Sequence, residues 1–512
     1  MLLSGAGSVG SSLSQTIVRK AKIIATIGPA SSSPAIVDRL IASGMNAARL
    51  NFSHGTYEWH AAAITTIRQA AVRQGSAVAI IQDLQGPRIR VGLVSQTGIH
   101  ITAGQSVRLR AWRSELEAQS IGPSSSTEIP ISYPYLTRDL RVGARILIND
   151  GLIELVADRI IDDVVECSVL IGGTITSHKG INLPGTVVSA PTLTEKDRND
   201  MRFGVEQDVD YMALSFVRGP NDIEAARTVL QQYGRCIPLI AKIERAEAVA
   251  ALDAILECAD GVMIARGDLG VEMGPEAVPI LQKRIIAEAN RRRRLVITAT
   301  QMLESMTQAT RPTRAEASDV ANAVFDGSDA VMLSAETAAG AYPVEAVQVM
   351  DRLTRAAEGS IEPGETVKAD SGRDSLSLAE AISAAAASAA RSVRARAIVA
   401  FTESGMTARL ISKQRPVSPL LAFTPSETIR RQMALYWGVR PFPMSRGGPP
   451  ETWIADAEQR LTEEHLCTPG DIVAVVSGTM AGQVGGTNML KLHKIGSLAS
   501  DRNKLPTTFQ SS

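Results

Sequence analysis

Short apolar segments recur along most of the chain, and each ends in polar or glycine residues. Eight of them have the length of a strand and lack helical spacing, so they predict buried β-strands. Between most neighbours lies one amphipathic segment of helical length, such as SPAIVDRLIASG. The eight segments are residues 22–28, 45–53, 78–84, 211–217, 237–244, 261–268, 295–301 and 330–336.

Eight strands with seven crossovers and a helix after the last predict a (β/α)8 barrel, the TIM-barrel fold of the α/β class. An open sheet with fewer strands is the alternative. We expect the barrel to comprise residues 17–86 and 188–358, after a Gly/Ser-rich flexible tail at residues 1–16.

The connection between the third and fourth segments is too long for one helix. It alternates in β fashion in IRVGLV, HITAGQSVRLR and ARILINDGLIELVADRIIDDVVECSVLIGG, and it contains the hairpin signal Asn149-Asp150-Gly151. We therefore expect an all-β domain at residues 87–187, inserted after the third strand. It leaves the barrel at the end where barrel chemistry occurs, so a lid is favoured, and an insertion with no catalytic part is the alternative.

The composition changes near residue 360, where SIEPGETVKADSGRDS predicts a polar linker. An alanine-rich helix follows, and ARAIVAFTES, VSPLLAFTP and DIVAVVSGT then alternate with helices. This pattern predicts an open α/β domain at residues 359–498 and a flexible tail at 499–512. Two hydroxyl- and glycine-rich turns after strands could each hold an anion on backbone N–H groups, although ordinary turn chemistry also explains them. The first contains Thr402, Ser404, Gly405 and Thr407, and the second contains Ser477, Gly478, Thr479, Gly485, Gly486 and Thr487.

Lys+Arg and Asp+Glu both number 53 in the 512 residues, so no surplus of charge points to nucleic acid or an anionic membrane as a partner. The four cysteines have no metal-ligand or disulfide-scaffold spacing, which fits a reducing compartment. No segment approaches 18 uninterrupted apolar residues, and no signal peptide is recognisable. We therefore expect a cytoplasmic protein.

Charged residues end two neighbouring predicted strands. Lys242 and Glu244 close the fifth segment, and Asp268 closes the sixth. Because the carboxyl ends of adjacent parallel strands meet at one edge, the two carboxylates should lie close enough to hold one divalent ion beside Lys242. Two carboxylates suit Mg²⁺, which takes its other ligands from water and an anionic substrate. The alternative is a surface cluster of ion pairs.

The other strand ends add cations, hydroxyls and amides to the same mouth: Arg49, Asn51, Ser53, His54, Asp83, Thr300 and Ser334. Arg49 offers a planar fork for a phosphoryl group, and Lys242 offers a compact charge. The N–H groups of Gly267 and Asp268 begin a predicted helix, where a substrate carboxylate could dock. These features predict phosphoryl transfer by metal and cation clamping. The chain has neither a Walker GxxxxGK[ST] motif nor the protein-kinase signature set.

Motifs in the same order as in pyruvate kinases run from about residue 20 to 345. They are KIIATIGPAS, ARLNFSHG, DLQGPRIR, HKGINLP, LTEKD, LSFVR, AKIE, ARGDLGVE, TATQMLESM, RPTRAEASDVANAVFDGSDAVMLSAET and YPVEAV. TESGMTARLIS and RPVSPLLAFTP extend the resemblance into the C-terminal region. The sequence thus resembles the pyruvate kinase family over nearly its whole length.

The resemblance implies transfer of the phosphoryl group of phosphoenolpyruvate to ADP, giving pyruvate and ATP in the last step of glycolysis, with Mg²⁺ or Mn²⁺ as cofactor. It implies that Lys242 and Arg49 contact the moving phosphoryl group and that Glu244 and Asp268 bind the metal. Thr300 would lie by the substrate carboxylate and the enolate, and the residues towards ADP would be Asn51, His54, Arg90 and Lys179. Thr300, Ser334 and water are all candidates for the final protonation of the enolate carbon.

Many family members need K⁺, held by groups that correspond to Asn51, Ser53, Asp83 and the carbonyl of Leu84. Where those members have glutamate, this chain has Arg88, a fixed cation that would repel K⁺. The resemblance therefore implies no K⁺ requirement. It also implies a sugar-phosphate or AMP effector near Thr402, and a homotetramer.

Two other functions compete with this interpretation. One is a different Mg²⁺-dependent barrel enzyme acting on phosphoenolpyruvate or an enolate, such as a lyase, which would need neither the lid nor the C-terminal domain. The other is a catalytically silent relative that regulates by binding a metabolite. Such relatives usually lose a charged residue of the site, whereas this chain keeps all of them.

Overall fold

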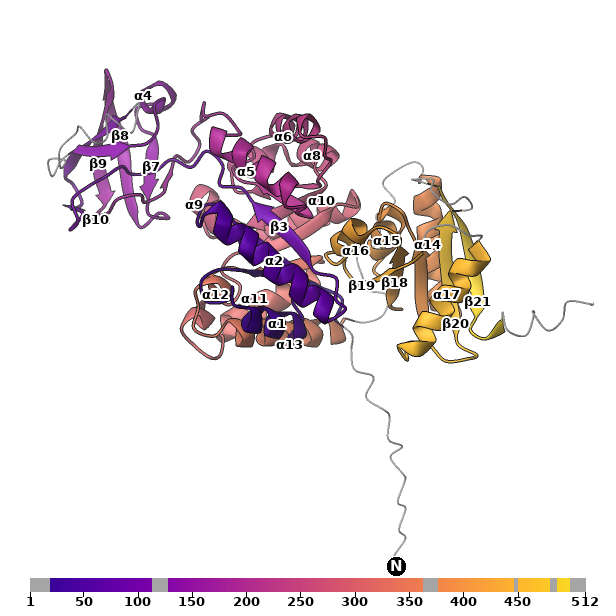
Figure 1. Ribbon diagram of the computed structural model, residues 1–512. Helices are drawn as coiled ribbons and strands as arrows, with labels where there is room; N and C mark the ends of the chain where they lie inside the picture. Colours follow the sequence, from indigo (N-terminus) through magenta and orange to yellow (C-terminus); the bar gives the residue numbers. More distant parts are fainter. Residues whose placement is uncertain (1–18, 113–127, 362–375, 446–449, 479–485, 498–512) are drawn as a thin grey trace, which may run out of the picture.

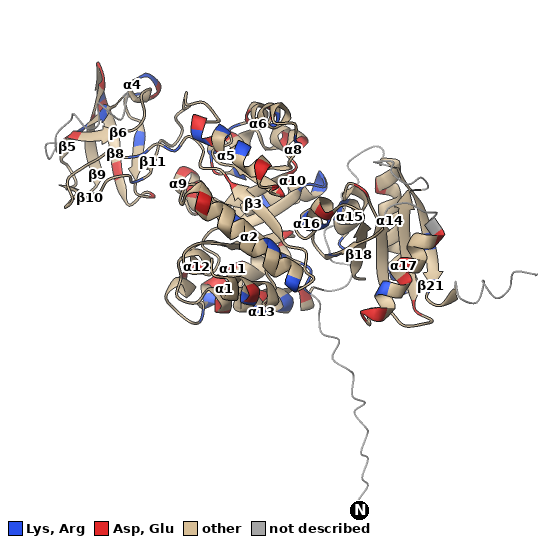
Figure 2. Ribbon diagram, viewed as in Figure 1, with Lys and Arg blue, Asp and Glu red and all other residues tan. Residues whose placement is uncertain are grey.

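The computed structural model describes residues 19–112, 128–361, 376–445, 450–478 and 486–497. The predicted tails at 1–16 and 499–512, and most of the predicted linker, lie outside these residues. Among the described residues, no helix is long and apolar enough to cross a membrane. Residues of both charge signs are interspersed over all parts of the molecule (Figure 2).

Eight parallel strands form a closed barrel in the middle of the molecule (Figure 1). Strands that follow one another in the barrel are neighbours, and β1 closes on β16. All eight predicted strands are confirmed, and the open-sheet alternative is wrong. The bounds are β1 (Lys22–Thr26), β2 (Ala47–Asn51), β3 (Ala79–Asp83), β12 (Tyr211–Leu214), β13 (Leu239–Ile243), β14 (Gly261–Ala265), β15 (Leu295–Ala299) and β16 (Ala330–Leu333).

The barrel strands are buried on both faces, which is why they have nearly continuous apolar sequences. In β1, Ile23 and Ala25 belong to the large core shared with the surrounding helices. Ile24, between them, belongs to a second cluster that includes Ile240 and Met263. Because successive side chains of a strand point to opposite faces, this second cluster fills the interior of the barrel.

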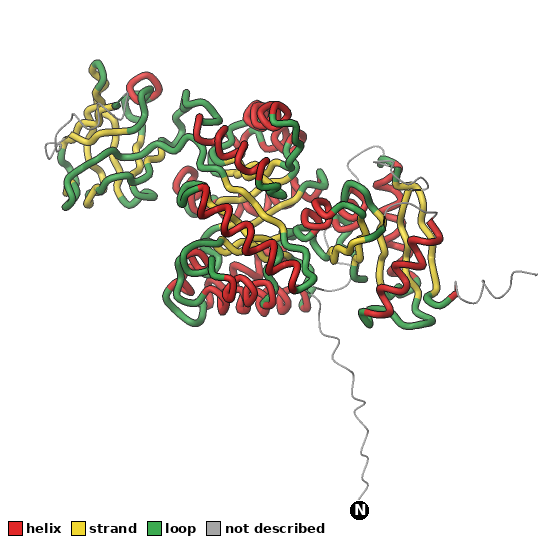
Figure 3. The backbone as a smooth tube through the Cα atoms, in the orientation of Figure 1, coloured by secondary structure: helices red, strands yellow, loops and turns green. Residues whose placement is uncertain are grey.

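Helices surround the barrel strands (Figure 3). Thr194 and Thr313 begin two of them with a capping box, in which an acidic side chain three residues later bonds back to the threonine N–H. The helices are α1 (Pro34–Ala42), α2 (Tyr57–Arg73), α5 (Glu195–Glu206), α6 (Pro220–Gln232), α7 (Ala246–Ala250), α8 (Leu252–Cys258), α9 (Arg266–Met273), α10 (Val278–Arg291), η1 (Glu304–Thr307), α11 (Arg314–Phe325), α12 (Ala335–Ala338) and α13 (Pro343–Gly359).

A separate β domain, the lid domain, leaves the barrel after β3 and projects away from it (Figure 1). It has its own apolar core and two sheets, in the orders β11-β7-β8-β9-β5-β6 and β10-β4. The all-β insertion is thus confirmed. Its elements are β4 (Ile99–Ile101), β5 (Ser106–Ala111), β6 (Glu128–Ile131), α4 (Leu136–Asp139), β7 (Arg145–Ile148), β8 (Ile153–Ile161), β9 (Val164–Ile171), β10 (Gly173–Ile175) and β11 (Ile181–Asn182).

Two local expectations for the lid domain have different outcomes. Asn149, Asp150 and Gly151 all have positive φ in the turn that joins antiparallel β7 and β8, as the hairpin signal predicted. IRVGLV, by contrast, forms no regular strand. Only Arg90 and Val91 make isolated bridges, because this segment carries the chain from the barrel into the lid domain.

The C-terminal domain is an open α/β sheet in the order β19-β18-β17-β20-β21. Four of its strands are parallel, and β21 is antiparallel to β20. The three predicted strands are present, while β19 and β21 are additional. The elements are α14 (Leu378–Ser392), β17 (Ala397–Phe401), α15 (Met406–Ser412), β18 (Leu420–Thr424), α16 (Glu427–Met433), β19 (Val439–Pro443), α17 (Pro450–Glu463), β20 (Ile472–Gly478) and β21 (Thr487–Lys494).

The C-terminal domain packs against the amino-terminal end of the barrel through buried charges. Lys22, the first residue of β1, donates a 2.7 Å hydrogen bond from Nζ to the carbonyl of Val439. Asp329 pairs with Lys413 and Arg415 of the C-terminal domain. Burial, helped by the charge of Arg19 and opposed by Glu358, lowers the pKa of Lys22 to about 7.

Replacing Lys22 by Met is expected to weaken the dependence of stability on pH. Between about pH 7 and the ordinary lysine value of 10.5, the unfolded chain holds a proton that the folded chain has released. Stability therefore rises with pH in this window, by up to about 1.4 kcal/mol per pH unit. Denaturant midpoints of both proteins between pH 7 and 9.5 measure the effect. Parallel profiles would contradict it.

Candidate active site

Lys242 lies in an ion-paired cluster at the carboxyl ends of the barrel strands. Its Nζ is 2.8 Å from Glu244 Oε1 and 3.4 Å from Asp83 Oδ1, and it donates a 2.8 Å hydrogen bond to Ser215 Oγ. Burial alone would lower the pKa of Lys242, but the carboxylates of Asp83 and Glu244 outweigh it and hold the pKa above its ordinary value. The site therefore keeps a charged ammonium group.

Arg49, at the end of β2, joins the same cluster. Its Nε donates to Asp83 Oδ2 at 2.6 Å, and its Nη1 donates to Thr26 Oγ1 at 3.1 Å. Burial would raise the pKa of Asp83, but the charges of Lys242 and Arg49 hold that pKa below its ordinary value. Asp83 is thus ionised, and it fixes the two predicted phosphoryl-binding cations beside each other.

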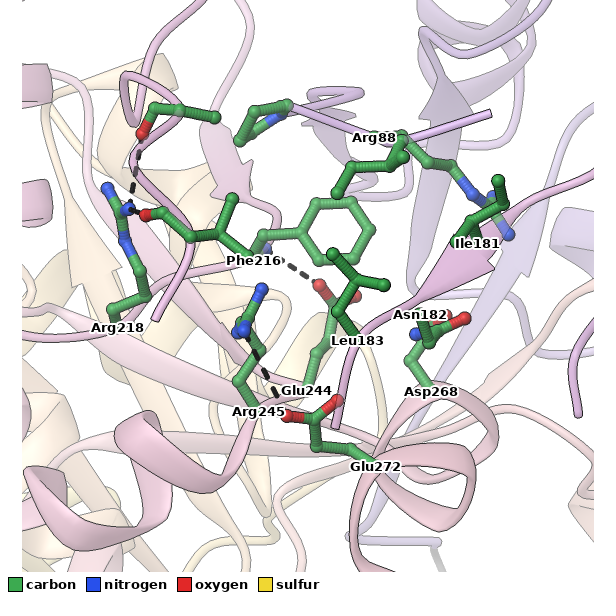
Figure 4. A pocket seen from close by; sticks show the side chains of 14 residues that line it. Arg88, Ile181, Asn182, Leu183, Phe216, Arg218, Glu244, Arg245, Asp268 and Glu272 are labelled. Carbon is green, nitrogen blue, oxygen red and sulfur yellow. Dashed lines mark hydrogen bonds and ion pairs between the residues drawn. The ribbon is translucent and has the colours of Figure 1, made fainter. Parts of the chain in front are cut away.

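Glu244 and Asp268 line one cavity between the barrel and the lid domain (Figure 4). Glu244 Oε2 accepts a 2.7 Å hydrogen bond from the Phe216 N–H. Burial and the charge of Glu244 raise the pKa of Asp268 to about 6. Burial is the larger cause of this shift, and repulsion from the Glu244 carboxylate adds to it. Glu244 directly follows β13, and Asp268 lies in the first turn of α9, directly after β14, so the two residues are at adjacent strand ends as the sequence predicted.

A divalent cation between Glu244 and Asp268 would remove that repulsion, so this donor set fits Mg²⁺. The described residues contain no group of three or more His, Cys, Asp or Glu side chains placed to hold a metal. A cation here would therefore take its remaining ligands from water and from an anionic substrate. That requirement suits Mg²⁺ better than Ca²⁺, which needs a fuller cage of protein oxygens.

Thr300 immediately follows β15 and meets the start of α9. Its Oγ1 accepts a 2.9 Å hydrogen bond from the Gly267 N–H and donates to the carbonyl of Ala299 at 2.7 Å. The predicted residues Thr300 and Gly267 are thus brought together from adjacent strand ends. The N–H that the sequence assigned to a substrate carboxylate is paired here with the Thr300 hydroxyl.

Ser334 follows β16, and its Oγ is buried without a hydrogen-bond partner among the described residues. Its N–H donates to Glu336 Oε2 at 2.6 Å, and Glu336 Oε1 accepts from the Leu303 N–H at 3.1 Å. The fully buried Glu336 carboxylate therefore ties the chain after β16 to the chain after β15. The Ser334 hydroxyl stays available to a ligand.

Arginines gather around His54, on the side predicted to face a nucleotide. Burial, followed by the charges of Arg90, Arg88 and Arg49, lowers the pKa of His54. Arg90 also donates from Nη1 to the carbonyl of His178 at 3.0 Å, which places it beside Lys179. Arg88 and Arg90 thus make a positive region near His54 where the lid domain joins the barrel, and Lys179 follows the residue that Arg90 contacts.

The residues predicted for a K⁺ site lie at the ends of β2 and β3. Asn51 Oδ1 accepts a hydrogen bond from the Ser53 N–H at 3.1 Å, and the Leu84 carbonyl accepts one from Ser215 Oγ at 2.7 Å. Asp83 is held by Arg49 and Lys242, as described above. Arg88 is half-buried in the entry to the lid domain, with Nη2 3.7 Å from Asp150 Oδ1.

The lid domain contributes directly to the walls of the candidate site. Ile181 and Leu183 line the cavity that contains Glu244 and Asp268, and a cleft of about 920 Å³ opens between the β7–β8 hairpin and α9. Two barrel arginines hold the segment that returns from the lid domain to the barrel. Arg218 donates to the Val188 carbonyl at 2.6 Å, and Arg245 donates to the Thr186 carbonyl at 3.0 Å.

The predicted effector turn lies in the C-terminal domain, between β17 and α15. Thr402 and Thr407 are buried, and Thr407 Oγ1 is hydrogen-bonded to Thr487 Oγ1 at 2.6 Å. Gly405 has φ of 79°, which a glycine adopts without strain. Ser404 is partly exposed beside it.

Several residues with contacts in the site were not identified from the sequence. Ser215 bridges Lys242 to the Leu84 carbonyl, and the Phe216 N–H holds Glu244. The strand-end position of Ser215 was an available signal for its contact. The side chains of Arg266 and Glu336 form hydrogen bonds with backbone atoms of other segments, and these segments become neighbours only when the barrel is closed.

Two family models match the chain. The model described as pyruvate kinase, barrel domain, covers residues 18–347, and the model described as pyruvate kinase, alpha/beta domain, covers residues 380–493. The match thus includes the lid domain and the C-terminal domain. Both would be unnecessary for the lyase considered above.

Named relatives and a solved structure agree with the family models. Pyruvate kinase 2 of Synechocystis is 44% identical over 483 residues, covering 93% of this chain and 79% of the relative. A Staphylococcus aureus pyruvate kinase is 43% identical over 481 residues, covering 94% of this chain and 81% of the relative. A crystal structure of a pyruvate kinase from Cryptosporidium parvum superposes with a TM-score of 0.87 at 38% identity, covering 93% of this chain and 96% of that one.

Proposed function

The chain belongs to the pyruvate kinase family and is a phosphotransferase with pyruvate kinase function, and from this premise we propose which of its residues carry out the reaction. Pyruvate kinases act on phosphoenolpyruvate and ADP and are generally Mg²⁺-dependent. The observation that carries the proposal is the cluster of Lys242, Arg49, Asp83 and Glu244, in which cations and carboxylates are held at 2.6–3.4 Å.

Lys242 and Arg49 bind the phosphoryl group as it moves from phosphoenolpyruvate to ADP. Asp83 orients both cations, so little reorganisation is needed when charge shifts onto the transferring oxygens. Glu244 and Asp268 would hold Mg²⁺, which when bound neutralises charge on the phosphoryl and enolate oxygens. A bound substrate carboxylate would replace Thr300 Oγ1 as the acceptor of the Gly267 N–H and the Ala299 carbonyl as the acceptor of the Thr300 hydroxyl proton.

Phosphoryl transfer leaves an enolate that must receive a proton on carbon. Ser334 Oγ is buried and unpartnered among the described residues, and Thr300 Oγ1 already serves the Gly267 N–H. These contacts favour Ser334, with or without an intervening water, as the route for this proton. His54, Arg90, Lys179 and Asn51 would hold ADP, which must already be bound to accept the phosphoryl group.

We further propose that the enzyme needs no K⁺. The charge of Arg88 adds to the lowering of the His54 pKa by burial and Arg90, and it partly opposes the rise of the Asp268 pKa, so this positive charge acts on both groups at the mouth. A fixed guanidinium in this position would supply the charge that K⁺ provides elsewhere and would repel K⁺ from Asn51, Ser53, Asp83 and Leu84.

Arg88→Glu is expected to create a K⁺ requirement. Initial rates with phosphoenolpyruvate, ADP and Mg²⁺ are compared in NaCl and KCl at equal ionic strength, for the natural protein and the variant. The natural protein should show equal rates, and the variant should be activated at least about tenfold by K⁺, because the substitution reverses a charge near the cation site and each unit of charge changes the affinity by roughly 1 kcal/mol. Strong activation of the natural protein by K⁺ would contradict the proposal, as would a variant that stays indifferent to K⁺.

Four broader assignments are also proposals. The family membership supports a homotetramer and a cytoplasmic location, and the turn at Thr402, Ser404, Gly405 and Thr407 is the candidate site for a sugar phosphate or AMP. Mn²⁺ would bind Glu244 and Asp268 in the same way as Mg²⁺. Sedimentation of the purified protein tests the homotetramer, and its activation profile with a sugar phosphate and with AMP tests the effector turn.

A further inference from the structure

Arg266 is a buried arginine that faces the backbone of a neighbouring strand end. Its Nη2 donates to the carbonyl of Thr300 at 2.7 Å and to that of Gln301 at 3.3 Å, and its Nε donates to the carbonyl of Ala299 at 3.3 Å. One guanidinium group therefore binds three consecutive carbonyls, starting with that of the last residue of β15. Only 9% of the residue is exposed.

Those carbonyls belong to a strained turn. Thr300 and Gln301 have φ values of 68° and 52°, so two consecutive residues with side chains adopt the left-handed conformation. Such a conformation costs on the order of 1–3 kcal/mol per residue and persists only where the surroundings enforce it. The cost is greatest for a β-branched residue such as Thr300.

The guanidinium group is itself held in place by contacts on the side away from the turn. Nη1 of Arg266 pairs with Asp319 of α11 at 2.6 Å and donates to Gln282 of α10 at 3.3 Å. These partners leave the planar fork facing the turn. A lysine could not replace it, because one ammonium cannot direct donors along a plane towards several carbonyls while also keeping the Asp319 pair.

The conformation of this turn sets the position of the Thr300 hydroxyl. In the observed left-handed backbone conformation, Thr300 Oγ1 lies 2.9 Å from the Gly267 nitrogen. Gly267 directly follows Arg266 in the chain, so the same residue pair fixes the turn and presents the N–H. A relaxed turn would rotate the hydroxyl away from this position.

We propose that Arg266 is a positioning residue for phosphoryl transfer, which holds the strained Thr300–Gln301 turn so that Thr300 Oγ1 faces the substrate. Arg266 touches no reacting atom and acts through Thr300. The inference rests on the role proposed above for Thr300.

Arg266→Lys, compared with a matched control, tests the inference. Arg68→Lys is the control, because Arg68 is a partly buried arginine that also binds two backbone carbonyls, of Val78 and Asp208, and a carboxylate, of Asp210. Its contacts lie at the opposite end of the barrel, just before β3 and β12. Both variants should lose thermal stability, whereas only Arg266→Lys should lower kcat, by about 100-fold, the scale of a misplaced catalytic group. Equal effects of the two variants on kcat would overturn the proposal.

A double-mutant cycle with Thr300→Ala separates positioning from a purely structural role. In the Thr300→Ala background, Arg266→Lys should lower kcat by no more than about twofold, because the hydroxyl that it positions is already gone. The same fold-loss in both backgrounds would overturn the inference. Full activity of the Thr300→Ala single variant would instead refute the proposed role of Thr300. This result is distinguishable from a failure of the Arg266 inference alone, in which Thr300→Ala still lowers kcat.

A milder variant keeps the test usable if Arg266→Lys does not fold. Asp319→Asn removes the charged anchor of Arg266 from a partly exposed position and leaves the turn itself intact. It should lower kcat in the natural background and leave kcat within about twofold in the Thr300→Ala background. Unchanged kcat in both backgrounds would overturn the inference.

Discussion

Lys242→Met is expected to lower turnover at least about 100-fold while phosphoenolpyruvate still binds. Removing one preorganised charge aimed at a transition state typically costs this much. The ammonium is in contact with Asp83, Glu244 and Ser215, so its position is fixed before substrate arrives. Methionine keeps the length and the apolar stem of lysine. Steady-state kcat and KM, with circular dichroism for the fold, measure the effect.

Lys413→Met is the matched control for this prediction. Lys413 is a buried lysine, paired with Asp329 and bonded to Asn290 at 2.7 Å, but it lies between the barrel and the C-terminal domain. Lys413→Met should lower stability, because it leaves the buried Asp329 carboxylate without one of its paired cations. It should not lower turnover as much as Lys242→Met does. A folded Lys242→Met protein with near-normal turnover would remove Lys242 from the mechanism.

Glu244→Gln should raise the Mg²⁺ concentration for half-maximal activity by at least about 100-fold, because loss of a direct ligand exceeds the 10–100-fold cost typical of outer partners. Glutamine has the same shape and can still accept from the Phe216 N–H, so the change is mainly one of charge. It should also lower the pKa of Asp268, which the Glu244 charge helps to raise. The Mg²⁺ concentration for half-maximal activity is measured by titrating the activity of both proteins with Mg²⁺.

Glu272→Gln provides a control within the same cavity. Glu272 lines this cavity together with Glu244 and Asp268, and its carboxylate is also buried, but its charged neighbour is Arg245, 3.9 Å away. Its replacement should leave the Mg²⁺ requirement unchanged. If Glu272→Gln shifted this requirement as much as Glu244→Gln, the assignment of the metal to Glu244 and Asp268 would be wrong.

The sequence was sufficient to predict the barrel because its strands are short, apolar and regularly separated by helices. It also predicted that Lys242, Glu244 and Asp268 would meet, since residues at the ends of adjacent parallel strands must share one edge. The two additional strands of the C-terminal domain were harder to recognise. β19 contains two prolines, and only two of the eight residues of β21 are buried, so neither has a continuous apolar pattern.

The parts of the site that escaped prediction depend on long-range contacts. No local signal indicates a left-handed turn at Thr300 and Gln301, because neither residue favours that conformation. The turn exists because Arg266, 34 positions before Thr300, binds its carbonyls. Glu336 likewise bonds to Leu303, 33 positions before it. Such contacts become visible only when the closed barrel places adjacent strand ends side by side.

The most direct measurement follows phosphoenolpyruvate, ADP, pyruvate and ATP together, with purified protein and Mg²⁺ in Na⁺ buffer without K⁺. Phosphoryl transfer at the Lys242 cluster predicts pyruvate and ATP in equal amounts, their formation abolished by chelating the metal and reduced at least about 100-fold in Lys242→Met. Folded natural protein that forms neither product, with or without K⁺ and candidate effectors, would contradict this function. Product formation that Lys242→Met leaves unchanged would contradict the proposed mechanism.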